Sequence, residues 1–248
     1  MSAIACVIVC FLSIYCCRPH EEITDVVEPQ HPTATLIFLH GAGESGPEIR
    51  RLVEKLSGGF SNYPNLRLVF PTAGAKTFSP FPWNGQVVNI WYNFDSLDIA
   101  TKENNTQIHE SAMVIEKLVE EQVLSGIPHK NICVAGFSSG GLMSLHLGYE
   151  YIKNLGCVGA MSAFLPTSSA LYEKLINQRD EVVSDLPPLY ISGGRLDFFI
   201  LPKWMKTTVD AFQTGGVNVT SVSQLEASHF LTRKSVRGLL EFVQKTIF

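Results

Sequence analysis

The sequence predicts an α/β fold in which a mostly parallel central sheet carries helices on both faces. Short apolar runs alternate along the chain with longer amphipathic patterns, which is typical of consecutive β-α-β units. The apolar runs are nearly continuous, as expected for strands that are buried on both faces. The predicted strands cover residues 35–39, 66–70, 132–135, 157–161, 189–192 and 217–224.

Helical patterns separate these strands. Between residues 108 and 123, apolar residues recur at steps of three and four, and the pattern ends near Gly126. Further helices are predicted over residues 47–56, 140–154, 170–178, 202–212 and 232–247. Residues 71–105 show no regular pattern and are rich in Pro, Gly, Asn and aromatic residues. Because long loops in compact domains usually carry function, this stretch is a candidate part of the site.

Size and charge limit the classes of function. With 248 residues and 46% apolar content, the chain can bury one large core. We expect an apolar segment at residues 1–20 and a single domain over residues 21–248, with a linker-like stretch at residues 19–32 across their boundary. The formal net charge of -4 and the pI near 6.0 provide no basic field for a phosphate backbone. Nucleic acid is therefore not an expected partner.

The cysteines are unevenly placed. Cys133 and Cys157 lie in predicted strands, and we interpret them as buried strand residues that do not form a disulfide. No CxxC pair, HExxH motif or Cys/His cluster offers the spacing of metal ligands, so neither a metal nor another cofactor is expected. The other four cysteines fall within the first seventeen residues: Cys6, Cys10, Cys16 and Cys17.

The N-terminal segment allows three interpretations. Its apolar run, residues 3–17, is shorter than the roughly 20 residues that span a bilayer. The first interpretation is the apolar core of a secretory signal, although no Lys or Arg precedes it. The second is an S-acylated tail in peripheral contact with a membrane. The third is a poorly ordered extension. The expected location is cytoplasmic with membrane association, and secretion is the alternative. Sequons at Asn104 and Asn218 matter only if the chain is secreted.

The strongest chemical signal follows the strand at residues 132–135. The segment Gly136-Phe137-Ser138-Ser139-Gly140 matches Gly-x-Ser-x-Gly between a buried strand and a helical pattern, which is the context of the nucleophile elbow of α/β-hydrolases. In so tight a turn, side chains two residues before and after the nucleophile would collide with backbone, so both glycines are expected to be required. Ser139 is the rival nucleophile, but Phe137 would then occupy a glycine position. Ser138 is therefore the predicted nucleophile.

A serine hydroxyl needs a base that takes its proton and an acid that orients the base. In α/β-hydrolases these follow in the chain order Ser, Asp or Glu, and His. Two histidines follow Ser138. His146 falls within a helix and is interpreted as an ordinary helix residue, whereas His229 lies on a short loop between the last strand and the last helix. His229 is the predicted base.

Four aspartates lie between Ser138 and His229. Asp197 follows a strand and a double-glycine turn, so its carboxylate is expected at the sheet edge that carries the elbow. Asp180 and Asp185 lie in a charged segment, and Asp210 falls within a helix. Asp197 is the predicted acid.

A negatively charged tetrahedral intermediate needs preorganised backbone N–H donors. One is expected from Ser139, directly after the nucleophile, and the other from a loop that follows an early strand. The segment LIFLHGAG, which begins at Leu36, supplies such a loop and makes Ala42 the candidate second donor. His40 is interpreted as a residue that shapes this loop through hydrogen bonds.

These residues together resemble the acyl-protein thioesterase and lysophospholipase-like family, a cofactor-free branch of the α/β-hydrolases. The resemblance runs from Thr35 to the C-terminus and implies hydrolysis of acyl thioesters on S-acylated proteins and of acyl esters in lysophospholipids or small substrates. It also implies Ser138, Asp197 and His229 as the catalytic triad, with Ala42 and Ser139 as oxyanion donors. It rests on LIFLHGAGESG from Leu36, FPTA from Phe70, NIWYN from Asn89, SGIPHKNICVAGFSSGG from Ser125, GAMSAFLP from Gly159, GGRLDFFILP from Gly193 and SHF from Ser228.

The sequence departs from the family pattern around the acyl site. Ser139 stands where the thioesterases commonly have Gln, Glu44 stands where the loop usually has Asp, and Phe198 replaces a Pro after the acid. Residues 77–88 also look longer than in the relatives, which leaves the preferred acyl-chain length open. The predicted acyl-site residues are Phe78, Phe81, Trp83 and Trp91.

The leading hypothesis is a serine hydrolase that forms an acyl intermediate on Ser138 and acts on an acylated protein or a small acyl ester. One alternative is a short-chain carboxylesterase without a protein substrate. Another is a catalytically silent hydrolase fold that binds lipids or partners, because a fold alone does not establish activity.

Overall fold

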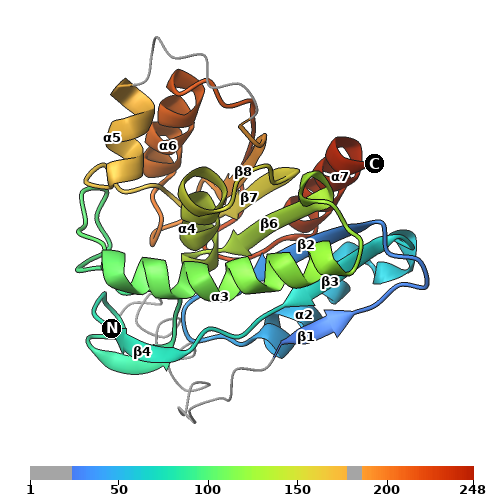
Figure 1. The fold of residues 1–248 in the computed structure, drawn as a ribbon. Helices are drawn as coiled ribbons and strands as arrows, with labels where there is room; N and C mark the ends of the chain where they lie inside the picture. The colour runs from blue at the N-terminus through green and yellow to red at the C-terminus, as the bar shows by residue number, and fades with distance from the viewer. Residues whose placement is uncertain (1–23, 178–185) are drawn as a thin grey trace.

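A seven-stranded sheet forms the centre of the computed structural model, which describes residues 24–177 and 186–248 (Figure 1). Its strand order is β1-β3-β2-β6-β7-β8-β9. All neighbouring pairs are parallel except β1 and β3, which are antiparallel. A separate antiparallel hairpin pairs β4 with β5. The strands are β1 (Asp25–Val27), β2 (Ala34–Leu39), β3 (Leu66–Phe70), β4 (Ala75–Phe78), β5 (Gln86–Asn89), β6 (Ile132–Phe137), β7 (Cys157–Met161), β8 (Leu189–Gly194) and β9 (Val219–Gln224).

Helices cover both faces of the sheet. Helices α2 and α7 pack against each other on one face, and α3, α4, α5 and α6 contribute to the core on the other face. Short 3-10 turns precede β3 and β6. The helices are α2 (Gly46–Ser57), α3 (Asn105–Leu124), α4 (Ser139–His146), α5 (Ala170–Asn177), α6 (Pro202–Thr214) and α7 (Arg233–Ile247).

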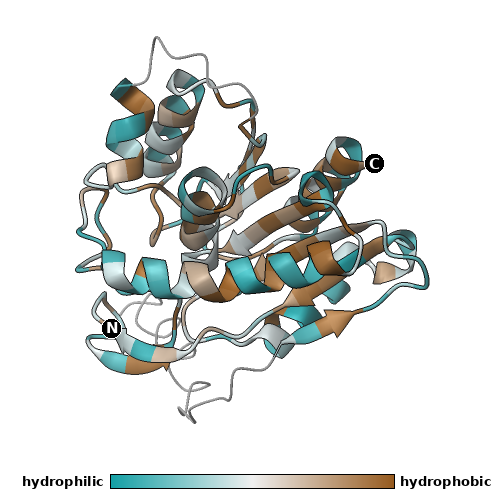
Figure 2. Cartoon of the chain, viewed as in Figure 1, coloured by the Kyte–Doolittle hydropathy of each residue, from teal (hydrophilic) through white to brown (hydrophobic). Residues whose placement is uncertain are grey.

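The central strands divide their side chains between two cores. In β2, Leu36 and Phe38 pack with α2 and α7, whereas Ile37 and Leu39 face the core shared by α3 and α4. Successive residues of a strand point to opposite faces, so a strand between two helical layers must be apolar at every position. Figure 2 shows that the central strands are brown along their length, whereas α3 mixes teal and brown.

The observed elements confirm the predicted mostly parallel sheet with helices on both faces. Three local expectations need correction. Residues 71–105 contain the β4–β5 hairpin, and the linker-like stretch before residue 32 contains β1, which extends the sheet beside β3. The helix predicted at residues 140–154 ends as an α-helix at His146 and continues as a π-helix over Leu147–Tyr151.

The N-terminal segment at residues 1–20 lies outside the described residues. Within residues 24–177 and 186–248, no helix is both long and apolar enough to cross a bilayer.

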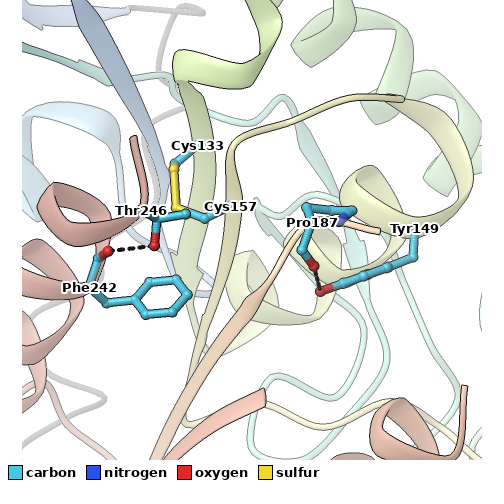
Figure 3. Close-up of a disulfide and its surroundings, with 6 residues drawn as sticks. All are labelled: Cys133, Tyr149, Cys157, Pro187, Phe242 and Thr246. Carbon is cyan, nitrogen blue, oxygen red and sulfur yellow. Dashed lines mark hydrogen bonds between the residues drawn. A yellow bond between two sulfur atoms is a disulfide. The ribbon is translucent and has the colours of Figure 1, made fainter. Parts of the chain in front are cut away.

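Cys133 and Cys157 are buried strand residues, but the prediction that they do not form a disulfide is wrong. They are joined by a disulfide between β6 and β7 (Figure 3). The two residues are direct partners in the parallel register, with Cα atoms 4.6 Å apart, and both belong to the core beneath α7. The bond therefore ties the strand that leads to Ser138 to its neighbour.

The disulfide should stabilise the fold measurably. It joins residues 24 positions apart, and closing a loop of that size in the unfolded chain is worth about 3 kcal/mol. We expect the Cys133→Ala/Cys157→Ala variant to lose about this much free energy of unfolding in urea denaturation without reductant. Reductant should shift the wild-type midpoint toward that of the variant and leave the variant unchanged. Equal midpoints for the oxidised wild type and the variant would contradict the stabilising role.

A buried ion network joins the end of α4 to the loop before α3. The side chain of His146 is 3% exposed, with Nε2 at 2.9 Å from Glu103 Oε1 and Nδ1 at 2.5 Å from Glu150 Oε2. Tyr92 donates its hydroxyl to the same oxygen of Glu103 at 2.6 Å. Burial lowers the pKa of His146, but the two carboxylates outweigh that effect and raise it to about 9. His146 is therefore a charged anchor and not an ordinary helix residue.

The network makes stability depend on alkaline pH. Because the pKa of His146 is about 9 in the folded state and 6.5 without the fold, its contribution is complete below pH 6.5 and is lost as pH rises through 9. We expect His146→Gln to lower the free energy of unfolding at pH 6 by about 3 kcal/mol, because the buried carboxylate of Glu103 loses its charged partner. The variant should also flatten the fall in stability between pH 6.5 and 9.

The exposed residue His31 provides the matched control. Urea titrations of His31→Gln should reproduce the wild-type dependence on pH. If His146→Gln kept the wild-type slope between pH 6.5 and 9, the buried charge on His146 would be refuted.

Candidate active site

The turn between β6 and α4 presents Ser138 at the carboxyl edge of the sheet. Ser138 has φ 52° and ψ -122°, a left-handed conformation that is unusual for a residue with a side chain. Its N–H donates to the carbonyl of Met161 at 2.8 Å, and its own carbonyl accepts from Leu142 at 3.0 Å. These bonds tie the turn to β7 on one side and to α4 on the other.

The two elbow glycines are required by close backbone contacts. A Cβ atom on Gly136 would lie 2.3 Å from the carbonyl carbon of Gly140. A Cβ atom on Gly140 would lie 2.4 Å from the carbonyl oxygen of Leu39 and 2.6 Å from that of His40. Neither position has room for a side chain, which agrees with the Gly-x-Ser-x-Gly pattern.

The structure brings Ser138, His229 and Asp197 into one hydrogen-bonded chain. His229 Nε2 lies 2.9 Å from Ser138 Oγ, and His229 Nδ1 lies 2.8 Å from Asp197 Oδ2. The imidazole also packs between the rings of Phe137 and Phe199, with centroids 5.1 and 5.3 Å away. In this orientation His229 can take the Ser138 proton while Asp197 holds the opposite ring nitrogen.

The carboxylate of Asp197 is fixed from its other side. Its Oδ1 accepts hydrogen bonds from the N–H groups of Phe199 at 2.9 Å and Ile200 at 2.8 Å. Of the rival acids, Asp210 lies on the exposed side of α6 and pairs with Lys206. The other two, Asp180 and Asp185, lie outside the described residues.

The loop after β2 is held by a neutral, buried histidine. His40 Nε2 accepts from the N–H of Ala73 at 2.9 Å, so the ring proton lies on Nδ1, which donates to the carbonyl of Gly41 at 2.6 Å. Burial lowers the pKa of His40 to about 4, which keeps this tautomer neutral. The predicted structural role of His40 is confirmed by these contacts.

Trp91 supports the same loop from behind. Its indole N–H donates to the carbonyl of His40 at 2.9 Å, and its side chain is 1% exposed. Trp91 does not line the acyl cavity, so its prediction as an acyl-site residue needs correction. Its indole N–H instead helps to position the loop after β2.

Two backbone amides are available for an oxyanion. The N–H groups of Ala42 and Ser139 have no acceptor among the residues that the structure describes, and both residues line the cavity beside Ser138. The loop around Ala42 is fixed on both flanks, because the Gly41 N–H donates to Glu44 Oε2 at 2.8 Å and the Gly43 N–H donates to the carbonyl of Asn89 at 2.9 Å. Burial raises the pKa of Glu44, and the Gly41 hydrogen bond opposes that change.

A small cavity of about 20 Å³ opens beside Ser138. Of the predicted acyl-site residues, Phe78 and Trp83 from the hairpin line this cavity, with ring centroids 5.0 Å apart. Phe81 does not line it and is 59% exposed at the hairpin turn, because that turn directs it away from the core. Sequence reasoning missed the other apolar wall residues, Phe94, Leu97, Leu142, Phe199 and Ile200. Phe199 and Ile200 could have been found from their position directly after Asp197.

Within the described residues, no three His, Cys, Asp or Glu side chains gather as metal ligands. The site consists of a hydroxyl, an imidazole, a carboxylate and two backbone donors around an apolar cavity. Such a set can form and break an acyl bond on Ser138 with groups of the protein alone.

Known proteins share this architecture. The model of the phospholipase/carboxylesterase family matches residues 21–247. Lysophospholipase-like protein 1 from Mus musculus is 28% identical over 211 residues, which cover 85% of this chain and 86% of the relative. Acyl-protein thioesterase 1 homolog 2 from Dictyostelium discoideum is 28% identical over 226 residues, which cover 89% of this chain and 97% of the relative.

A solved structure supports the fold independently. The crystal structure of Zea mays acyl-protein thioesterase 2 superposes with a TM-score of 0.76 at 22% identity, covering 92% of this chain and all of that one. The fold is thus that of an α/β-hydrolase, and the family model extends over nearly the whole chain. The chain belongs to the phospholipase/carboxylesterase family of α/β-hydrolases.

Proposed function

We propose that this protein hydrolyses acyl esters and thioesters through an acyl intermediate on Ser138. The observation that carries the proposal is the imidazole of His229, which bridges Ser138 and Asp197 at 2.9 and 2.8 Å. The names of the relatives support it, since they include acyl-protein thioesterases and a lysophospholipase-like protein. The substrate is therefore an acylated protein or a small acyl ester.

Each group has a defined role in the proposed reaction. Ser138 Oγ attacks the acyl carbonyl as His229 Nε2 takes its proton, and the N–H groups of Ala42 and Ser139 stabilise the resulting oxyanion. Asp197 holds the imidazole in the required tautomer and stabilises its charged form. The protonated imidazole then gives its proton to the departing alcohol or thiol. Water activated by His229 finally releases the carboxylic acid and restores Ser138.

The volume of the cavity favours short acyl groups. Sites for drug-sized molecules span about 300–1,000 Å³, whereas the cavity beside Ser138 has a volume of only about 20 Å³. The ring of Phe78 lies 5.0 Å from that of Trp83 and 5.1 Å from that of Phe94, and all three rings line the cavity. This observation supports the second candidate function, a short-chain carboxylesterase without a protein substrate. Peripheral membrane contact through residues 1–20 stays a prediction, because that segment lies outside the described residues.

The proposed role of Asp197 can be tested with a matched control. Asp197→Asn should lower kcat for a short acyl ester about 10⁴-fold, because the amide favours the wrong tautomer of His229. Asp210→Asn makes the same chemical change on the exposed side of α6 and should leave kcat within twofold of wild type. Ser138→Ala serves as the blank for both. A loss smaller than about tenfold in Asp197→Asn would exclude it as the orienting acid.

The chain-length preference can be tested by enlarging the cavity. We expect kcat/KM of the full chain to fall from butyryl to palmitoyl in matched oxyesters and thioesters, because the cavity holds only a short chain. Trp83→Ala should shift the optimum toward longer chains, whereas Phe81→Ala, which changes an exposed aromatic of the same hairpin, should leave it in place. A wild-type optimum at palmitoyl thioester would favour a depalmitoylating enzyme over the short-chain esterase. Activity no higher than that of Ser138→Ala on every substrate would refute catalysis.

A further inference from the structure

The disulfide between Cys133 and Cys157 has no part in the proposed hydrolysis. Both cysteines are fully buried and sit opposite each other in adjacent strands (Figure 3). Disulfides form and persist in oxidising compartments and are rare in the cytosol, where thiol systems keep cysteines reduced. The bond therefore favours maturation in the secretory pathway, which is also where Asn-x-Thr sequons are glycosylated.

One of the two sequons lies at an open edge of the sheet. Asn218 is exposed and directly precedes β9, which is the last strand of the sheet. Its backbone is fixed, because its carbonyl accepts from the N–H of Leu189 at 2.9 Å. Its side-chain amide makes no hydrogen bond within the described part of the chain, and Thr220, which completes the sequon, is exposed as well. The amide nitrogen is thus accessible without the loss of any contact.

The position of Asn218 is compatible with an active site that stays open. Ser138, Asp197 and His229 follow the carboxyl ends of β6, β8 and β9, whereas Asn218 lies at the amino end of β9. A strand of this length separates its two ends by roughly 20 Å. A bulky polar group at Asn218 would also shield the unpaired edge of β9 against pairing with another strand.

The asparagine of the second sequon already uses its side chain in a hydrogen bond. Asn104 is exposed, but its side-chain oxygen caps α3 by accepting from the Gln107 N–H at 3.1 Å. Its backbone N–H donates to the carbonyl of Asn93, in the segment that leads to the cavity wall. Because the side chain of Asn104 takes part in a hydrogen bond and that of Asn218 does not, Asn218 is the better candidate for glycosylation.

We propose that the chain matures in the secretory pathway and carries an N-linked oligosaccharide on Asn218. The donor is an oligosaccharide linked to a lipid diphosphate. Nδ2 of Asn218 forms the bond to the anomeric carbon of the first sugar, one amide proton is released, and the lipid diphosphate is the leaving group. The disulfide forms in the same compartment, where a protein disulfide accepts the two electrons of the cysteine thiols.

The test uses the full chain with its own N-terminus, produced in cultured animal cells. Thr220→Ala destroys the sequon and Thr220→Ser preserves it, and both changes are on an exposed side chain. We expect peptide N-glycosidase to increase the gel mobility of the wild type and of Thr220→Ser. The Thr220→Ala protein should migrate faster than both before the digestion, because it lacks that glycan.

Peptide mass spectrometry after the digestion should find Asp at position 218 in the wild type and Asn in Thr220→Ala. Non-reducing maps should join the peptides that contain Cys133 and Cys157. An unmodified Asn218, or a glycan on Asn104 alone, overturns the proposal. Neither readout depends on hydrolytic activity, so failure of this proposal is distinct from failure of the proposed reaction.

Discussion

The site depends on one backbone constraint, the close approach between the elbow at Ser138 and the loop after β2. Gly140 lies so near the carbonyls of Leu39 and His40 that a single added carbon would collide with both. The register between β2 and β6, in which Leu39 is opposite Gly136, sets this approach. Because the proposed nucleophile and the two proposed oxyanion donors lie on these two segments, the same contact sets the distance between Ser138 and the two backbone amides.

The loop after β2, which carries Ala42, is held by a chain of buried polar contacts that reaches α3. Ser111 donates to the carbonyl of Trp91, Trp91 donates to the carbonyl of His40, and His40 accepts from Ala73. A protonated His40 could not accept that bond, and burial lowers its pKa to about 4, so the chain stays intact at neutral pH. With Nε2 accepting from Ala73 and Nδ1 donating to the carbonyl of Gly41, neither ring nitrogen of His40 is left to act as a base.

The sequence predicted features whose signals are local and missed those that depend on strand register or packing. The elbow turn could be predicted because Gly136, Ser138 and Gly140 fall within one turn, and the residues of the proposed triad could be chosen because their chain order is characteristic of α/β-hydrolases. The disulfide could not be predicted from a spacing of 24 residues, since it depends on β6 and β7 pairing with Cys133 opposite Cys157. Likewise, nothing near His146 in the sequence indicates that Glu103 reaches it.

The His146 network links the cavity wall to the helix of the nucleophile. Glu103 pairs with Phe94 through an isolated β-bridge, and Phe94 lines the cavity with its ring against Phe78. At its other end the network includes His146, the last residue of α4, and α4 begins directly after Ser138. Buried charges of this kind are costly unless they are fully paired, and here both imidazole nitrogens and the shared Glu103 oxygen have partners. The cavity wall at Phe94 and the helix that follows Ser138 are therefore positioned by one set of contacts.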